Sequence, residues 1–440
     1  MKYFRLYLIL ILAVALFLRL YHIGFEDIWI DEATSLYYAQ KPLFENIQWI
    51  ASDAGLPLYN IILGNWITLF GISAVSVRLI SSIAGVLAVL CIAFLGRQMY
   101  SDKVGLLSSA LLAVSPLAIR YSQEARCYSL FLLISILSMY FFKKKGSEYL
   151  ITTAALIYTH IFGFFVLAFQ FLVSFFRKEK TGLQLIVMCT FLPWLPVLFA
   201  QASRVTAEFW IPKPTPADFL NTLVDFAGSV YLFAIFLILL VVLIWKKTKD
   251  IFTLSALLLI PMIIVYVYSN LFTPLFVTRY FIFALPVFLI LFAKGIYEID
   301  KKHISIIVLV AVLSLSFAQS LTELNENNKP DWKKTSDFIK ENSKKGDALI
   351  LQPIYQIEPF SYYFSPQCFT TNVYLCPKTD VHVFVASNVS DLQRFSKFLK
   401  STVWLIQSIT EDTTVYDDLA STRNLSQSQE FNWIKIYKFT

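Results

Sequence analysis

The chain has 440 residues, of which 57% are hydrophobic and 15% charged, and its mean hydropathy is +0.63. Soluble domains carry about 25% charged and roughly 45–50% apolar residues. The composition therefore excludes a soluble enzyme, a disordered protein and a disulfide-rich secreted module. Long apolar runs without alternating ten-residue strands predict membrane helices rather than an outer-membrane barrel. The net charge of +7 comes with no helix-turn-helix or zinc pattern, so no nucleic-acid role is indicated.

The first apolar run begins close to the N-terminus. Lys2 and Arg5 precede the run from Leu6 to Leu18, which continues into Arg19 without the small residues of a signal-peptide cleavage site. We therefore expect a retained first helix whose start lies in the cytoplasm.

Ten further apolar stretches bring the predicted number of spans to about 11. They lie near residues 76–95, 104–119, 128–142, 149–166, 162–176, 182–200, 226–245, 251–268, 280–296 and 303–320. Lysines and arginines gather in alternate connections, near 97–103, 143–145, 177–180, 246–249 and 301–302. By the positive-inside rule, the outer side holds the segments 21–75, 120–127, 201–225, 269–279 and everything after about 321.

The first outer loop, residues 21–75, is too long for a simple turn. Its apolar piece from Pro57 to Phe70 would cover about 21 Å as a helix, which is less than the ~30 Å hydrocarbon core. An amphipathic helix in the membrane interface is expected, with Tyr59 and Trp66 at headgroup level.

The composition turns polar after about residue 325. Strand-like runs occupy Asp347–Gln352, Val381–Ala386, Val403–Ser408 and Trp433–Phe439, and helix-like runs occupy Trp332–Asn342 and Ser390–Leu399. We expect a transmembrane domain over 1–322 and a small extracytoplasmic α/β domain over 323–440. Cys368 and Cys376 could form a disulfide in an oxidising compartment.

Polar motifs lie on the predicted outer side. Asp31 and Glu32 follow Trp29, and two adjacent carboxylates near a membrane surface are either a base with its partner or an ordinary solvated pair. Arg126 and Arg279 depart from the positive-inside rule, as does Arg120. These arginines either extend to lipid headgroups or hold a phosphate.

Taken together, these segments resemble a known family. Trp29-x-Asp31-Glu32-Ala33 is followed by Ala51-x-Asp53-x-x-x-Pro57-Leu58-Tyr59, then Leu69-Phe70-Gly71 and Val77-Arg78-Leu79, then Ser115-Pro116 and Tyr121-Ser122-Gln123-Glu124-Ala125-Arg126-x-Tyr128. The order and spacing are similar to those of bacterial membrane glycosyltransferases of the family 39 type, relatives of the protein O-mannosyltransferases and the lipid A aminoarabinose transferase. Arg279-Tyr280 with Pro286, and Asp331-Trp332-Lys333, also fit, although the tail matches less closely.

The resemblance implies an α-helical polytopic membrane protein of GT-C architecture. Such an enzyme moves a sugar from a polyprenyl-phosphate donor to a lipid, glycan or protein acceptor on the outer face of the bacterial cytoplasmic membrane. The family's catalytic aspartate maps onto Asp31. Where the family usually has His-Pro-Pro, this chain has Gly55-Leu56-Pro57, so any role of that histidine would be missing or supplied by His160.

The departing polyprenyl phosphate is a stable anion and needs no general acid, unlike a glycoside oxygen. One base therefore suffices, and a single displacement predicts inversion. We expect Asp31 as this base, Glu32 as its orienter or a sugar-hydroxyl contact, and two arginines on the phosphate. The expected donor contacts are Arg126, Arg279, Glu124, Gln123, Asp53, Tyr59, Tyr128, His160, Tyr280 and Trp29.

No metal is expected to be obligatory, although Asp31, Glu32 and Asp53 could bind a divalent ion through oxygen. The alternative function is a transporter or flippase of lipid-linked sugars, which would place ionisable residues within spans and show two similar halves. Few charges inside the predicted spans and no evident repeat disfavour it. The tail domain is expected to be a lid or spacer; the alternative is acceptor recognition through Trp332, Tyr355 and Tyr362-Tyr363-Phe364.

Overall fold

The computed structural model describes residues 2–205, 211–371, 381–395, 399, 401–408, 410 and 412–440. The chain forms two compact units. The first comprises Met1–Ile23, Pro42–Gly71 and Val75–Glu326, and the second comprises Gly24–Lys41, Ile72–Ala74 and Asn327–Thr440. The predicted outer loop over 21–75 is thus divided between the units, and its Asp31 segment belongs to the second.

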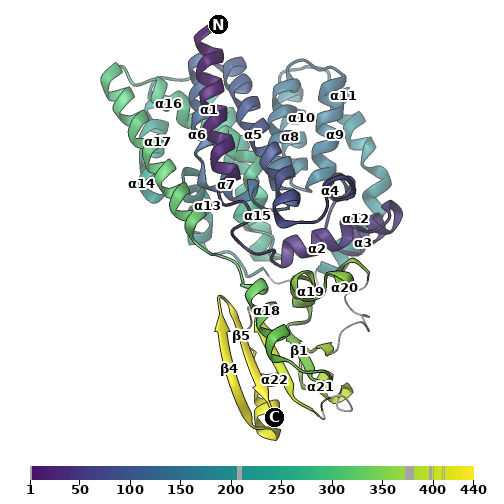
Figure 1. Ribbon diagram of the computed structural model, residues 1–440. Coiled ribbons are helices and arrows are strands. Elements are labelled where there is room, and N and C mark those ends of the chain that lie inside the picture. The colour runs from purple at the N-terminus through teal and green to yellow at the C-terminus, as the bar shows by residue number, and fades with distance from the viewer. Residues whose placement is uncertain are drawn as a thin grey trace. The chain divides into compact units, whose positions relative to one another are not determined.

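The first unit is helical (Figure 1). Its α-helices are α1 (Lys2–Leu20), α3 (Leu43–Ser52), α4 (Pro57–Phe70), α5 (Ala74–Met99), α6 (Asp102–Ala113), α7 (Pro116–Ser122), α8 (Tyr128–Phe142), α9 (Ser147–Thr159), α10 (Gly163–Phe176), α11 (Gly182–Thr190), α12 (Leu195–Val205), α13 (Pro216–Ala227), α14 (Val230–Trp245), α15 (Ile251–Leu271), α16 (Leu285–Tyr297) and α17 (Lys302–Asn325). Two 3-10 segments, η1 (Leu192–Trp194) and η2 (Thr278–Ala284), precede α12 and α16. The core surrounds α16, which packs against α6, α14 and α15.

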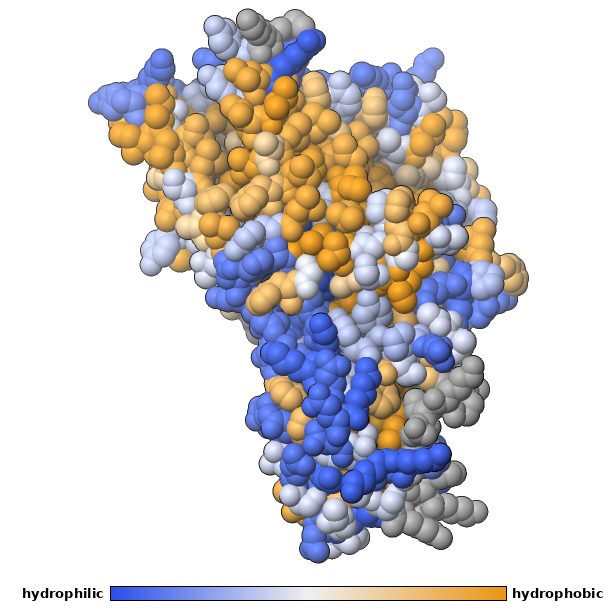
Figure 2. Space-filling model, in the orientation of Figure 1, coloured by the Kyte–Doolittle hydropathy of each residue, from blue (hydrophilic) through white to orange (hydrophobic). Residues whose placement is uncertain are grey.

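The predicted apolar stretches are mostly helical, but breaks between helices interrupt those near 104–119, 149–166 and 226–245. Helix α4 covers the predicted residues, with Pro57 in its first turn and Gly71 after its end. Within the described residues, six helices are long and apolar enough to cross a membrane, or up to eight if each bent pair counts as one span. Two shorter apolar helices are α8 and α10. Apolar residues cover much of the visible face of this unit (Figure 2). The chain is a multi-pass membrane protein.

A buried arginine stabilises a break between two helices. The α6–α7 pair bends by 60°, where Ser115 caps α7 and Pro116 occupies its first turn. The bend leaves carbonyl groups at the end of α6 without helical partners. The guanidinium of Arg19, which is fully buried, donates to the carbonyls of Leu112 at 3.2 Å and Ala113 at 3.1 Å. Arg19 thereby satisfies this helix end inside the apolar core.

Gly85 allows α5 to approach Arg19 and α7 closely. A Cβ atom at this position would lie 2.2 Å from Oγ of Ser122 and 2.7 Å from Nε of Arg19. We therefore expect Gly85→Ala to destabilise the helical unit by about 1–3 kcal/mol, the usual cost of overpacking. Gly182→Ala is the matched control, because its added Cβ would meet nothing within 4 Å. Thermal unfolding in nanodiscs tests this difference, and equal midpoints for the two variants would contradict it.

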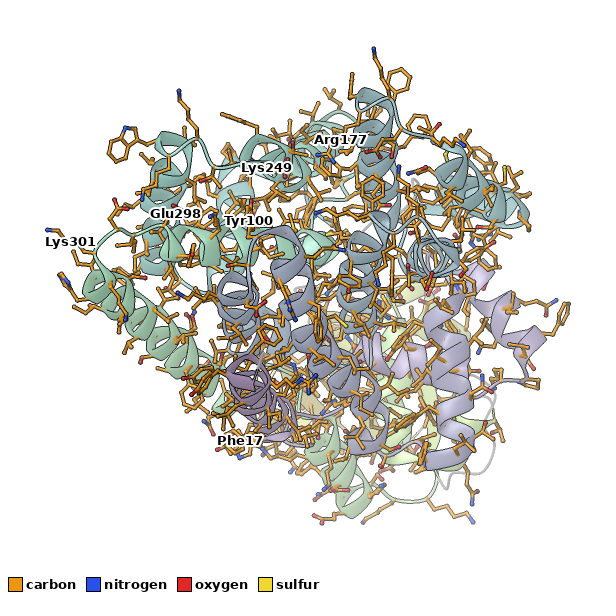
Figure 3. The ribbon with its side chains drawn as sticks, turned by 90° about the horizontal axis from the view of Figure 1, so that it is seen from above. Phe17, Tyr100, Arg177, Lys249, Glu298 and Lys301 are labelled. Atoms are coloured by element: carbon orange, nitrogen blue, oxygen red, sulfur yellow. The ribbon has the colours of Figure 1, made fainter. Side chains whose placement is uncertain are left out.

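The predicted inner turns gather at one end of the helical unit. The hydroxyl of Tyr100 donates to the carbonyl of Lys249 at 3.1 Å, and Arg177 pairs with Asp250 at 3.5 Å. These contacts link the α5–α6, α10–α11 and α14–α15 turns. Figure 3 looks onto this end and labels Tyr100, Arg177, Lys249, Glu298 and Lys301.

The second unit contains a five-stranded mixed sheet in the order β2-β1-β3-β5-β4. The strands are β1 (Ala348–Gln352), β2 (His382–Val385), β3 (Val403–Ser408), β4 (Leu425–Phe431) and β5 (Ile434–Phe439). Strand β1 is parallel to β2 and β3, and β5 is antiparallel to β3 and β4. The helices are α2 (Ile30–Ala39), α18 (Trp332–Asn342), α19 (Ile357–Phe364), α20 (Pro366–Thr370), α21 (Val389–Arg394) and α22 (Thr414–Thr422), and η3 is Ile354–Gln356.

The predicted α/β fold of the C-terminal residues is therefore confirmed, and the compact unit that contains it also includes Gly24–Lys41 and Ile72–Ala74. Its core packs α21 and α22 against one sheet face, whereas Trp404 on the other face meets Phe338 of α18 at a ring distance of 6.1 Å. Cys368 is disulfide-bonded, and Cys376 lies outside the described residues.

Candidate active site

The connection between α7 and α8 carries several of the predicted site residues and is fixed by α5. Hydroxyls of Ser81 and Ser82 donate to the carbonyls of Arg126 at 3.3 Å and Ser122 at 2.8 Å. The side-chain amide of Gln123 donates to three carbonyls at the end of α1, those of Leu18, Arg19 and Tyr21, at 2.7–3.2 Å. These contacts make Gln123 a cap for α1 and give Arg126 a rigid backbone.

Two guanidinium groups lie around one tyrosine ring. The guanidinium carbon of Arg126 is 6.0 Å from the ring centre of Tyr128, and that of Arg279 is 5.8 Å from the same centre. Arg279 also lies 5.8 Å from the ring of Tyr280, its neighbour in η2. Both arginines are half-buried. The fold therefore brings two segments far apart in sequence to one cationic group of side chains, which can bind an anion bidentately.

His160 joins this group from the connection between α9 and α10. Its ring stacks on Phe131 at 4.9 Å and lies 5.1 Å from the ring of Tyr280. Desolvation, together with the charges of Arg126 and Arg279, lowers the pKa of His160 to about 3, so the imidazole is neutral at neutral pH. Nδ1 accepts the backbone N–H of Phe162 at 3.2 Å, which assigns the hydrogen to Nε2. His160 is therefore a neutral hydrogen-bond donor.

Three other residues of the helical unit that were predicted as donor contacts, Asp53, Tyr59 and Glu124, differ from one another in their exposure to solvent. Asp53 ends α3, is exposed, and accepts the N–H of Ala54 at 2.8 Å. Tyr59 is buried in α4. Glu124 is also buried, and its carbonyl accepts the N–H of Arg126 at 2.8 Å.

The predicted carboxylate pair lies in the second unit, in the first turn of α2. Trp29 is the residue before this helix, and Ser35 donates to the carbonyl of Asp31 at 3.0 Å. Asp31 is half-buried, whereas Glu32 is fully buried. Carboxylates in the first turn of a helix are stabilised by its N-terminal partial charge.

Lys329 pairs with this acidic segment and was not predicted. Its Nζ lies 3.6 Å from Oε2 of Glu32, 3.3 Å from Oε2 of Glu26 and 5.8 Å from the ring centre of Trp29. The side chain is only 9% exposed. The available signal was a lysine immediately before the Pro330-Asp331-Trp332 motif.

Other contacts fix the Asp31 segment within the second unit. The backbone N–H of Lys333 donates to Asp27 at 2.8 Å, and the hydroxyl of Thr34 donates to Glu358 at 2.6 Å. The backbone N–H of Ile28 donates to the hydroxyl oxygen of Tyr363 at 2.8 Å. Tyr363 belongs to the predicted aromatic cluster, so the structure gives this tyrosine a structural contact.

The chain is similar to a family of sugar-transfer enzymes. Residues 54–198 match the model of the family described as dolichyl-phosphate-mannose-protein mannosyltransferase. A comparison with curated proteins finds no match.

Solved structures share the fold over nearly the whole chain. ArnT from Cupriavidus metallidurans in the apo state is 11% identical with a TM-score of 0.64, over 98% of this chain and 97% of that chain. The structure of the same protein bound to undecaprenyl phosphate is 12% identical with a TM-score of 0.63, and the match again covers 98% of this chain and 97% of that chain. A third match is the oligosaccharyltransferase AglB from Archaeoglobus fulgidus in complex with an inhibitory peptide and a dolichol-phosphate. It is 10% identical with a TM-score of 0.55, over 92% of this chain and 69% of that chain. The predicted GT-C resemblance is confirmed.

A further structure of the Archaeoglobus oligosaccharyltransferase, at 12% identity and a TM-score of 0.54 over 92% of this chain and 68% of that chain, contains Zn and sulfate. In the described part of the present chain, no group of three or more His, Cys, Asp or Glu residues could hold a metal ion.

Proposed function

We propose that this chain, which has the fold of ArnT, transfers a sugar from a polyprenyl-phosphate donor to a hydroxyl acceptor with inversion of the anomeric carbon. The observation that carries the proposal is the placement of Arg126 and Arg279 around Tyr128 in the helical unit. Two half-buried guanidinium groups within an apolar fold fit a lipid-borne phosphate. Solved structures of ArnT and AglB hold undecaprenyl phosphate and a dolichol-phosphate, respectively, which supports this choice of donor.

Asp31 is the proposed general base, which removes the proton from the acceptor hydroxyl as its oxygen attacks the anomeric carbon. The bond from that carbon to the phosphate oxygen breaks, and the departing anion needs no proton. Glu32 is fully buried and paired with Lys329, which favours the orienting role over a contact with the sugar. Trp29 is a candidate apolar face for the sugar ring.

The roles of the other proposed donor contacts follow from the chemical groups of their side chains. Tyr128 and Tyr280 hold the two guanidinium groups in place, and His160 donates Nε2–H to a phosphate or sugar oxygen. Glu124 is proposed to orient the arginines. Gln123, Asp53 and Tyr59 remain proposed donor contacts. Gln123 lies at the end of α1, Asp53 at the end of α3 and Tyr59 within α4.

The proposed location is the bacterial cytoplasmic membrane, with the N-terminus in the cytoplasm and the α/β unit outside. The basic turns shown in Figure 3 fit the cytoplasmic side by the positive-inside rule. No obligatory metal is proposed.

The test uses the full chain in nanodiscs with a panel of polyprenyl-phosphate sugars and candidate acceptors. The expected result is release of polyprenyl phosphate together with a glycoside of inverted configuration. Retained configuration would contradict the single displacement. Movement of intact donor across the bilayer without bond cleavage would support a transporter instead.

The low pKa of His160 predicts a specific pH behaviour. Because the imidazole titrates near pH 3, it stays neutral between pH 5.5 and 8 and contributes no limb to the pH–rate profile there. His160→Gln keeps a neutral donor, and we expect it to lower the transfer rate without changing the shape of the profile. Steady-state kinetics across this range provide the measurement. Loss of a limb with a midpoint between pH 6 and 7 in the variant would contradict the prediction.

A further inference from the structure

We infer that Lys329 is a positioning residue for the transfer reaction, acting through Glu32 and Trp29 to fix the first turn of α2, which carries Asp31. This inference rests on the proposed function. It also gives the α/β unit a role beyond the lid, spacer or acceptor-recognition alternatives, because the sheet holds Lys329 in turn.

The negative charges of the carboxylates in the Asp31 segment need a nearby cation to compensate them. Four carboxylates, those of Glu26, Asp27, Asp31 and Glu32, lie within seven residues of sequence. Glu32 is fully buried, and a buried carboxylate is stable as an anion only when a cation or several N–H groups compensate it. Lys329 supplies a positive charge to Glu32 and to Glu26 at once.

The position of Lys329 fixes the entry into α2 from two directions. Its two carboxylate partners precede and follow the residues from 27 to 31, and its ammonium group lies 5.8 Å from the ring centre of Trp29. Trp29 makes no side-chain capping hydrogen bond to α2. The start of this helix is therefore held by the Glu26–Lys329–Glu32 contacts instead of by a side-chain cap.

The backbone of Lys329 is itself held by the turn between β4 and β5. The side-chain amide of Asn432 donates to the carbonyls of Lys329 at 2.8 Å and Asn327 at 3.0 Å. The backbone carbonyl of Asn432 accepts the N–H of Asp331 at 3.2 Å. A continuous path of contacts thus runs from the β4–β5 turn through Lys329 and Glu32 to the helix that carries Asp31.

The kinetic test compares Lys329→Met, Lys329→Arg and Lys333→Met in the full chain in nanodiscs. A displacement of about 1 Å at a reacting group can cost on the order of 100-fold in rate. We expect K329M to lower kcat by about 10- to 100-fold with the donor KM within about threefold of wild type. Arginine should restore most of the rate because it keeps the charge. K333M should match wild type, since its side chain is exposed and only its backbone contacts Asp27.

Coupling to Glu32 distinguishes positioning from donor binding. If Lys329 acts through Glu32, the double variant K329M/E32Q should be no slower than the slower single variant. A K329M variant within twofold of wild type would overturn the inference. So would a tenfold rise in donor KM with unchanged kcat, because Lys329 would then contact the donor directly.

Hydrogen exchange tests the inference without turnover. Amides of α2 should exchange faster in K329M and in Asn432→Ala than in K333M, and K329R should resemble wild type. Unchanged exchange of α2 in both K329M and N432A would overturn the positioning role. A wild-type chain that consumes no polyprenyl-phosphate sugar would contradict the proposed function instead, and the exchange data would still decide whether Lys329 fixes α2.

Discussion

Asp31→Asn is expected to reduce the rate of sugar transfer by about 100- to 10,000-fold, the contribution typical of a general base. Asparagine keeps the size of the side chain and its place in the first turn of α2, but cannot take the proton of an acceptor hydroxyl. Binding of polyprenyl phosphate should be unchanged, because the proposed phosphate ligands are arginines of the helical unit. Single-turnover transfer and equilibrium binding of the lipid provide the two measurements.

The control for this substitution is Glu45→Gln. Glu45 also lies in the first turn of a helix of the predicted outer loop, α3, and its side chain is exposed. It should transfer sugar at the wild-type rate. An Asp31→Asn variant as fast as Glu45→Gln would remove Asp31 as the base and direct attention to Glu32, Asp53 and Glu124.

Arg126→Gln and Arg279→Gln are each expected to weaken binding of polyprenyl phosphate by about 10- to 100-fold. A hydrogen bond to a charged group contributes about 1.5–3 kcal/mol, which corresponds to this range. Lysine at either position should restore only part of the affinity, because it lacks the planar pair of donors. Since both groups surround the ring of Tyr128, the double variant should lose less than the product of the two single effects.

Arg97→Gln serves as the control for charge alone. Arg97 belongs to the predicted inner turns and pairs with Asp102 at 2.7 Å on the surface. Lipid binding by this variant should equal that of wild type. Equal weakening by Arg97→Gln and Arg279→Gln would show that the lipid responds to net charge and not to the arginine pair.

Secondary structure was predictable where local chemistry determines it. Pro57 and Gly71 define α4, and apolar length defines the helices of the first unit. Strand β4 (Leu425–Phe431) was missed because its sequence LSQSQEF is almost entirely exposed and shows no apolar alternation. Only pairing with β5 makes it a strand.

Residues of the candidate site were predictable where a single residue departs from the positive-inside rule. Arg126 and Arg279 were identified because they lie on the predicted outer side, where lysine and arginine are normally scarce, and the fold places them together. Glu32 and Lys329 are paired only by tertiary structure, so the sequence could not show why a buried carboxylate is tolerated. Gln123 shows the reverse case, since a residue of a site motif caps the end of α1.

The most direct test follows the two halves of a doubly labelled donor, with tritium in the sugar and radioactive phosphorus in the phosphate. The purified chain in nanodiscs is incubated with this donor and an acceptor, and the lipid and acceptor fractions are counted. The proposed transfer predicts that tritium moves to the acceptor while phosphorus stays with the polyprenol as its monophosphate. Both labels moving to the acceptor, or both remaining on one intact lipid, would contradict it.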